Sequence, residues 1–169
     1  MKKGILVVAL LAIGAMQVPA APAAAAASEC SRWTAAAEED EGGPALTARV
    51  CASGSDAALV LQCGNEPYFR YDPGPGAPEI AEGSRVELVF KTETASVRAK
   101  LDYQAMDGSL GLDLTRDAPL LKLFRAGHTV SVSDAAGRLP PHEFTLAGAS
   151  AAIAKVIAGC GQGGGDGGD

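Results

Sequence analysis

The side chains with the most versatile chemistry in this sequence are four cysteines and two histidines. His128 and His142 flank a turn centred near Gly137, so a hairpin over this region places Val132, and not His128, opposite His142. The two imidazole rings then lie roughly 13 Å apart along the sheet, too far to bind one metal ion. We therefore expect no metal site built on the histidines.

Nucleophilic catalysis needs a serine or cysteine that is activated by a neighbouring base. The sequence has no G-x-S-x-G motif, and we expect all four thiols to be oxidised. Acidic residues are plentiful, but no spacing singles out a pair for acid–base work. The glycine and aspartate residues of 163–169 make only one imperfect fragment of a calcium-binding repeat. We expect no catalytic, cofactor-binding or metal-binding residue; a hydrolase with an unrecognised carboxylate site is an alternative.

The first 27 residues have the features of a secretory signal peptide. Two lysines near the start precede an apolar run over 4–15, and the segment ends in the small residues Ala25–Ala27. The apolar run is too short to span a membrane. We therefore expect residues 1–27 to be removed and the mature protein to be periplasmic or secreted.

A lipid anchor is the alternative for this region, because Cys30 lies just behind the predicted cleavage site. Lipoprotein processing needs a small residue before the acylated cysteine, whereas Glu29 occupies that position. The sequence therefore favours a freely released protein.

The charge balance excludes several kinds of partner. The whole chain carries a formal net charge of −6. Without the two lysines of the leader, 12 basic residues face 20 acidic ones, which gives −8. This excess is spread along the chain and disfavours nucleic acid and anionic membrane surfaces as partners. We expect a monomer with a protein partner and no cofactor.

Four cysteines in an exported chain indicate two disulfides, which can be paired in three ways. Alternation places Cys30 and Cys51 on the polar faces of two strands, and the turn near residue 41 sets residue 30 opposite 51 or 52. Pairing Cys51 with Cys63 is disfavoured, since the next hairpin sets residue 58 opposite 51 and leaves a stagger of roughly 15 Å. We therefore predict Cys30–Cys51 and Cys63–Cys160.

Cys160 is the last residue on the apolar face of a predicted helix. Ile153, Val156, Ile157 and Cys160 follow the i, i+3, i+4, i+7 spacing of one side of a helix. This helix consists largely of alanine and glycine, so its packing alone holds it weakly. Closing the chain between residues 63 and 160 contributes on the order of 4 kcal/mol to stability. The disulfide is therefore expected to fix the last helix to the sheet.

Apolar and polar residues alternate over most of 31–132, which is typical of half-buried antiparallel strands. A helix is predicted from Pro119, with Asp117 near its cap, to Gly127, followed by a hairpin over 128–146. The sequence thus predicts a mainly β protein: one antiparallel β-sandwich domain over 28–160, with about eight strands in two layers, two short α-helices and two disulfides. The glycine-rich tail, 161–169, is expected to be disordered.

One proline-rich loop is a candidate interface. Prolines and glycines between Asp72 and Pro78 exclude regular structure, and three aromatic residues precede them. Aromatic side chains often anchor protein interfaces, although many belong to the core or its rim. The candidate interface residues are Tyr68, Phe69, Tyr71, Asp72 and Pro73.

The segment 118–156 contains a leucine-rich helix, a glycine before a strand, a glycine turn, and a strand that enters a leucine-x-glycine step and an alanine-rich helix. This order resembles the closing segment of invasion-associated locus B proteins, exported proteins of Gram-negative bacteria. The matching positions are Leu120, Leu121, Gly127, Val130, Gly137, Phe144, Leu146, Gly148, Ala152 and Ile153. The chain lacks the adjacent glycine–cysteine step that members of that family have in the middle of the sequence. It is also similar, more weakly, to accessory proteins of type VI secretion clusters.

The resemblance implies an envelope protein linked to host interaction, with no assigned enzymatic activity. We therefore expect a non-enzymatic periplasmic or secreted binding protein that acts on a protein partner of the envelope or host and contributes to virulence. The alternative is an inhibitor of a host enzyme such as lysozyme, in which the loop over 72–78 enters the active-site cleft.

Overall fold

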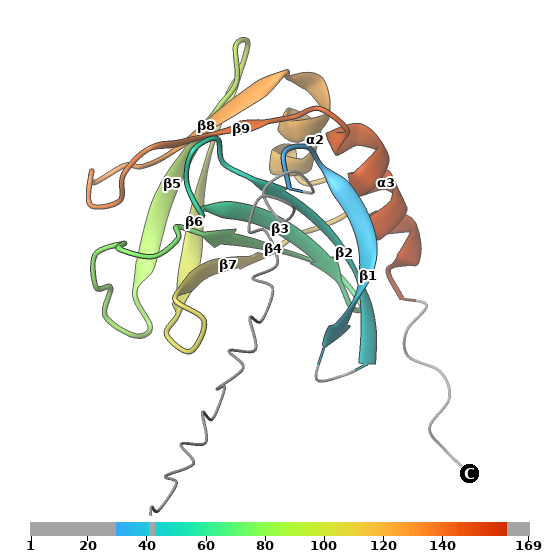
Figure 1. The fold of residues 1–169 in the computed structure, drawn as a ribbon, viewed down its shortest axis with the longest axis horizontal. Helices are drawn as coiled ribbons and strands as arrows, with labels where there is room; N and C mark the ends of the chain where they lie inside the picture. Colours follow the sequence, from blue (N-terminus) through green and yellow to red (C-terminus); the bar gives the residue numbers. More distant parts are fainter. Residues whose placement is uncertain (1–29, 41–42, 162–169) are drawn as a thin grey trace, which may run out of the picture.

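The computed structural model describes residues 30–40 and 43–161, so the predicted leader lies outside the described residues, as does nearly all of the predicted tail. Figure 1 shows a strongly curved sheet with two helices beside it. The elements within the described ranges are β1 Thr34–Asp40, β2 Gly43–Cys51, β3 Ala58–Cys63, β4 Pro67–Asp72, β5 Arg85–Lys91, β6 Ser96–Gln104, β7 Ser109–Asp113, α2 Pro119–Ala126, β8 Thr129–Asp134, β9 His142–Thr145 and α3 Ala149–Gly159.

All pairings between these strands are antiparallel, and the nine described strands form one sheet in the order β1-β2-β3-β4-β7-β6-β5-β8-β9. The prediction of a mainly β, sandwich-like domain with two helices and two disulfides is confirmed. Its layers are parts of a single sheet that curls over, as Figure 1 shows for β8 and β9. The two ends of the sheet approach each other. Trp33 donates its backbone N–H to the Ala147 carbonyl oxygen (2.9 Å), and Ser53 donates its backbone N–H to the Glu143 carbonyl oxygen (3.3 Å).

The core fills the inner face of the curled sheet. Phe124 of α2 lies at its centre, with ring centroids 5.7 Å from Phe69, 5.8 Å from Trp33 and 5.9 Å from Phe90. Four such rings bury a large apolar area in one place. Helix α2 begins with Pro119 in its first turn as predicted; its cap residue is Ala118, and the predicted capping by Asp117 is wrong, because no side chain caps this helix.

The β1–β2 hairpin pairs Thr34 with Arg49, a register that would set residue 53 opposite Cys30. The chain departs from this register before Thr34, because Cys51 donates its backbone N–H to the carbonyl oxygen of Cys30 (2.9 Å). Residue 30 therefore lies beside residue 51, as predicted. The parity is unchanged, so Cys30 and Cys51 share a face and form the predicted disulfide, with a Cα–Cα distance of 5.2 Å. Cys51 pairs with Ala58, as predicted.

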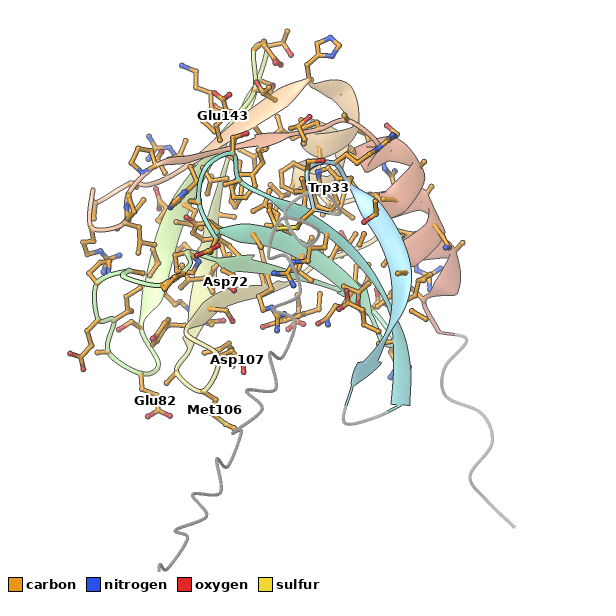
Figure 2. All side chains as sticks on the ribbon, viewed as in Figure 1. Trp33, Asp72, Glu82, Met106, Asp107 and Glu143 are labelled. Carbon is orange, nitrogen blue, oxygen red and sulfur yellow. A yellow bond between two sulfur atoms is a disulfide. The ribbon has the colours of Figure 1, made fainter. Side chains whose placement is uncertain are left out.

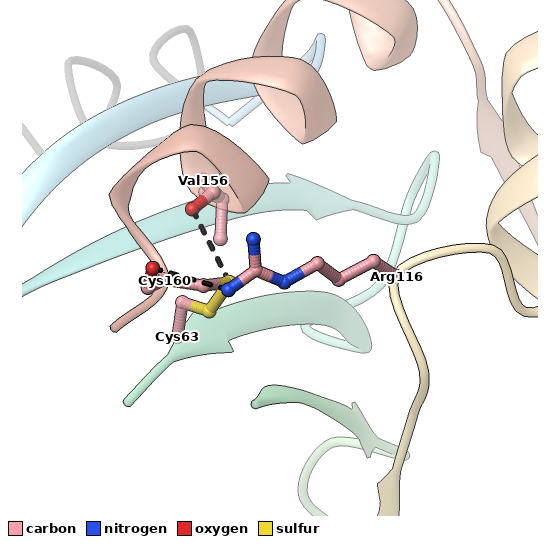
Figure 3. The surroundings of a disulfide bond; sticks show 4 residues. All are labelled: Cys63, Arg116, Val156 and Cys160. Atoms are coloured by element: carbon pink, nitrogen blue, oxygen red, sulfur yellow. Dashed lines mark hydrogen bonds between the residues drawn. A yellow bond between two sulfur atoms is a disulfide. The ribbon is translucent and has the colours of Figure 1, made fainter. Parts of the chain in front are cut away.

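The second predicted disulfide, Cys63–Cys160, is also confirmed and joins the end of α3 to the inner face of β3 (Figure 3). Ile153 and Val156 are buried on the same side of the helix. Arg116 adds a contact that the spacing did not predict, since its Nη2 donates a hydrogen bond to the carbonyl oxygen of Cys160 (3.2 Å). The terminal helix is therefore held by a covalent bond, apolar packing and several hydrogen bonds, which include those of Lys155 to Ala35 and of Ser150 to Arg125.

Gly148 starts α3 in a conformation that other residues adopt only with strain, at φ +86°. A β-carbon there would lie 2.6 Å from the carbonyl oxygen of Trp33, which is backbone and cannot rotate away. We expect Gly148→Ala to lower the free energy of unfolding by about 2 kcal/mol or more in urea denaturation. Gly137→Ala is the matched control, because it has a similar φ of +71° and open space, so the expected loss is about 1 kcal/mol. Equal losses would contradict the importance of the Trp33 contact.

Candidate functional site

The predicted aromatic interface is only partly at the surface. Side chains of β4 alternate between the inner and outer faces of the sheet, which leaves Phe69 0% and Tyr71 1% exposed. Burial also raises the pKa of the Tyr71 hydroxyl. Pro73 is buried as well. The prediction is therefore corrected: these three side chains belong to the interior, because their strand parity directs them inward.

The other two predicted residues lie on the outer side. Tyr68 is half-buried, and its ring leans across the neighbouring strand above Gly111, where a β-carbon would collide with the phenol. Burial, followed by the charge of Asp113, raises the pKa of Tyr68. Asp72 is half-buried and its Oδ1 accepts the backbone N–H of Gly74 (2.9 Å). Asp72 therefore shapes the start of the proline-rich loop.

A groove of about 1020 Å³ lies on the outer face of β1 and β2. Its lining includes the Cys30–Cys51 disulfide and continues into the β2–β3 turn. The groove is therefore built on paired strands and a covalent cross-link. The lining residues are Cys30, Ser31, Thr34, Ala36, Glu38, Thr47, Arg49, Cys51, Ala52, Ser53, Gly54, Ser55 and Asp56.

The lining of this groove is mixed in character. Arg49 is exposed near its middle, while the hydroxyl of Thr47 is buried and has no hydrogen-bond partner among the described residues. Glu38 on β1 and Asp56 in the turn place negative charge toward the two ends. Such a surface offers hydrogen-bond donors in its centre and acceptors at its ends.

A second surface feature lies at one end of the molecule, where Figure 2 shows Glu82, Met106 and Asp107 together. Met106 is 100% exposed in the turn between β6 and β7. Glu82 and Asp107 are exposed acidic residues. This acidic end includes part of the loop that follows Asp72.

The two histidines lie on the same hairpin. Val132 pairs with His142, as predicted, while the His128 carbonyl accepts the N–H of Leu146. His142 Nδ1 is 3.1 Å from the hydroxyl of Ser55 in the β2–β3 turn, which links this turn to β9. The described residues contain no cluster of three or more His, Cys, Asp or Glu that would hold a metal ion.

Burial lowers the pKa of the His142 imidazole. The unfolded chain therefore binds the proton more readily than the folded protein. We expect the free energy of unfolding to rise with pH between about pH 5 and pH 7 and to reach its full value above the ordinary pKa of histidine. Urea denaturation across this range checks the sign. His142→Asn is expected to flatten this rise and the exposed control His128→Asn to retain it; the reverse would contradict the assignment to His142.

The pKa of Glu93 is strongly lowered because its carboxylate accepts hydrogen bonds that join two elements of the fold. Hydrogen bonds from its own backbone N–H and from that of Thr129 lower the pKa of the Glu93 carboxyl to about 2. The carboxylate oxygen Oε1 also accepts a hydrogen bond from the Thr129 hydroxyl group (3.0 Å). It thereby joins the β5–β6 turn to the start of β8.

Neither described helix is long and apolar enough to cross a membrane. No model of a protein family, no curated protein and no solved structure gives a significant match to this chain.

Proposed function

We propose that this protein is a non-enzymatic binding protein, periplasmic or secreted, that acts as a monomer on a protein partner of the envelope or the host. The groove on the outer face of β1 and β2 is the observation that carries this proposal. Protein interfaces combine apolar area with polar groups, and the groove offers both, because alanines and the disulfide line it together with Arg49 and Thr47. The resemblance of 118–156 to invasion-associated locus B proteins supports a role in virulence.

The position of β1 suits the recognition of an extended segment. β1 stands at one end of the sheet order and pairs only with β2 among the described strands. Helix α3 partly covers the edge of β1, since Lys155 Nζ donates a hydrogen bond to the carbonyl oxygen of Ala35 (3.1 Å). An extended segment of a partner can lie along the groove, on the outer face, where side chains of β1 and β2 supply its contacts.

A site-specific photocrosslinker placed in the groove tests this proposal. Benzoylphenylalanine at Ala36, an exposed groove residue, is expected to capture one envelope or host protein, and excess unlabelled wild type is expected to suppress the capture. The same group at Ala95, an exposed alanine in the β5–β6 turn, is the matched control. Capture at Ala95 and not at Ala36 would place the interface elsewhere and contradict the proposal.

A second candidate function is inhibition of a host enzyme. The acidic end favours it, because the fully exposed Met106, with Glu82 and Asp107 labelled toward the same end of the view in Figure 2, suits a cleft with a positive rim. Incubation with c-type and i-type lysozymes tests it. The candidate requires loss of lytic activity at micromolar protein and recovery of activity with Met106→Ser; full activity with the wild type present would remove it.

A further inference from the structure

We propose that the outer face of β2–β4 binds the carboxylate of a single acidic residue, carried by an extended protein segment, between Arg49 and Arg70. This inference deepens the proposed function and rests on it, because it names the chemical group that the groove recognises. Four observations carry it: the register of the two arginines, their lack of close carboxylate partners, a buried hydroxyl beside them, and the charge pattern along the groove.

The sheet register places the two arginines on either side of one residue. Arg49 of β2 pairs with Val60 of β3, and Val60 pairs with Arg70 of β4. All three side chains point to the outer face, and the two arginine backbones lie roughly 10 Å apart, two strand spacings. Val60 is only 2% exposed on this face. Two guanidinium groups above one small apolar residue suit an oxyanion that accepts hydrogen bonds from both.

The arginines of β2 and β4 differ from the other arginines on the outer face. Arg85 lies 2.7 Å from Asp102, and Arg98 lies 3.0 Å from Glu87, so each is neutralised across a strand pair. The Arg70 guanidinium approaches the Asp107 carboxylate only to 3.9 Å. Its Nε is buried and has no hydrogen-bond partner in the described part of the chain.

Arg49 differs even more from the paired arginines Arg85 and Arg98. It has no ion pair or hydrogen bond within the two described ranges, although acidic residues outnumber basic ones in the sequence. Arg49 thus has no ion pair in the described residues and Arg70 has only the 3.9 Å contact, on the two strands that flank β3. In an acidic protein this is the charge arrangement of an anion site.

Thr47 supplies a hydrogen-bond donor beside Arg49. It is two residues away on the same strand and face, and it lines the groove. Thr47 is 1% exposed, and its Oγ1 finds no hydrogen-bond partner within 30–40 and 43–161. A buried hydroxyl without a partner costs free energy, and a bound carboxylate relieves this cost by accepting a hydrogen bond from it.

The charges along the groove define the ligand further. Arg49 lies between Glu38 toward the β1–β2 turn and Asp56 in the β2–β3 turn, a span of roughly 20 Å along the strands. A segment with one central acidic residue and basic residues at both ends complements this pattern. A continuous run of acidic residues would meet repulsion at both ends.

The probe is therefore a capped heptapeptide with a central glutamate, lysine at each end and serine or valine between. Its control is the same peptide with glutamine at the centre. In isothermal titration calorimetry with the purified mature protein, we expect the glutamate peptide to bind at least tenfold more tightly than the glutamine peptide. Arg49→Gln and Arg70→Gln are each expected to weaken binding about tenfold. Arg85→Gln, paired to Asp102 on the same face, is expected to change it less than twofold.

The outcomes separate the inference from the proposed function. Equal binding of the two peptides overturns the carboxylate site, and an Ala36 crosslink would then still support the protein-binding role. Binding of inorganic phosphate without binding of the glutamate peptide also overturns it, because the source of the oxyanion would not be a protein segment. Loss of binding in Arg85→Gln equal to that in Arg70→Gln would show a general charge effect and overturn it as well.

Discussion

Replacing Cys63 and Cys160 together with serine is expected to lower the free energy of unfolding by about 4 kcal/mol. The disulfide closes a loop with a sequence separation of 97, and its removal releases the unfolded chain from that constraint. Apart from a few hydrogen bonds, helix α3 is held otherwise by modest apolar packing, because only Ala149, Ala152, Ile153 and Val156 of its residues are buried. Urea denaturation of the double variant measures the loss.

The control is the pair Cys30→Ser and Cys51→Ser, whose sequence separation is only 21. Its expected loss is about 3 kcal/mol by the same loop-entropy argument. Hydrogen exchange distinguishes the two variants further. Amides of 149–159 are expected to lose protection when the Cys63–Cys160 bond is removed and to keep it in the control. Unchanged protection of α3 in both variants would contradict its dependence on the disulfide.

Truncating Phe124 to alanine is expected to cost about 4 kcal/mol, since it removes a fully buried aromatic ring. This ring contacts Trp33, Phe69 and Phe90 and so joins α2 to both halves of the sheet. The cavity would open at the centre of the molecule, where β4 and β5 limit collapse. Thermal and urea denaturation measure the change.

Met106→Ala is the control for this truncation, because Met106 is fully exposed and its loss is expected to change stability by less than about 0.5 kcal/mol. A Phe124→Ala cost below about 1 kcal/mol would contradict the central position of the ring. Comparable effects of the two substitutions would do the same.

The sequence was sufficient to predict the cysteine pairing because parity constrains it. Cys51 and Cys63 lie on opposite faces of neighbouring strands, and this follows from counting alternate residues along a hairpin whose turn is visible in the sequence. The opposition of Val132 and His142 followed from the same argument. Short turns with glycine fix the register locally, so these predictions did not require the tertiary structure.

The aromatic interface was wrong in part for a reason that was readable in the sequence. Tyr68, Arg70 and Asp72 share one parity, while Phe69 and Tyr71 share the other. Alternation in β4 was therefore a signal that these two aromatics face inward. The five candidate residues fall within the short stretch 68–73, but the strand directs their side chains alternately to two faces of the sheet.

The groove and the arginine pair depend on contacts that no local pattern contains. Arg49 and Arg70 are brought to the same face only when β2, β3 and β4 pair in order. The contact between Ser55 and His142 likewise arises because the curled sheet returns β9 to the β2–β3 turn. Which strands adjoin is set by the packing of the whole chain, and this explains why the site was not predicted.

An open groove on the outer face requires that α3 cover the inner face of β1–β3, and peptide mapping under non-reducing conditions tests this most directly. Cys51 lines the groove on the outer face, whereas Cys63 faces α3 on the inner side. Recovery of one peptide pair with Cys30 and Cys51, and another with Cys63 and Cys160, is the predicted result. Recovery of a Cys51–Cys160 pair would place α3 over the groove and contradict an open binding surface there.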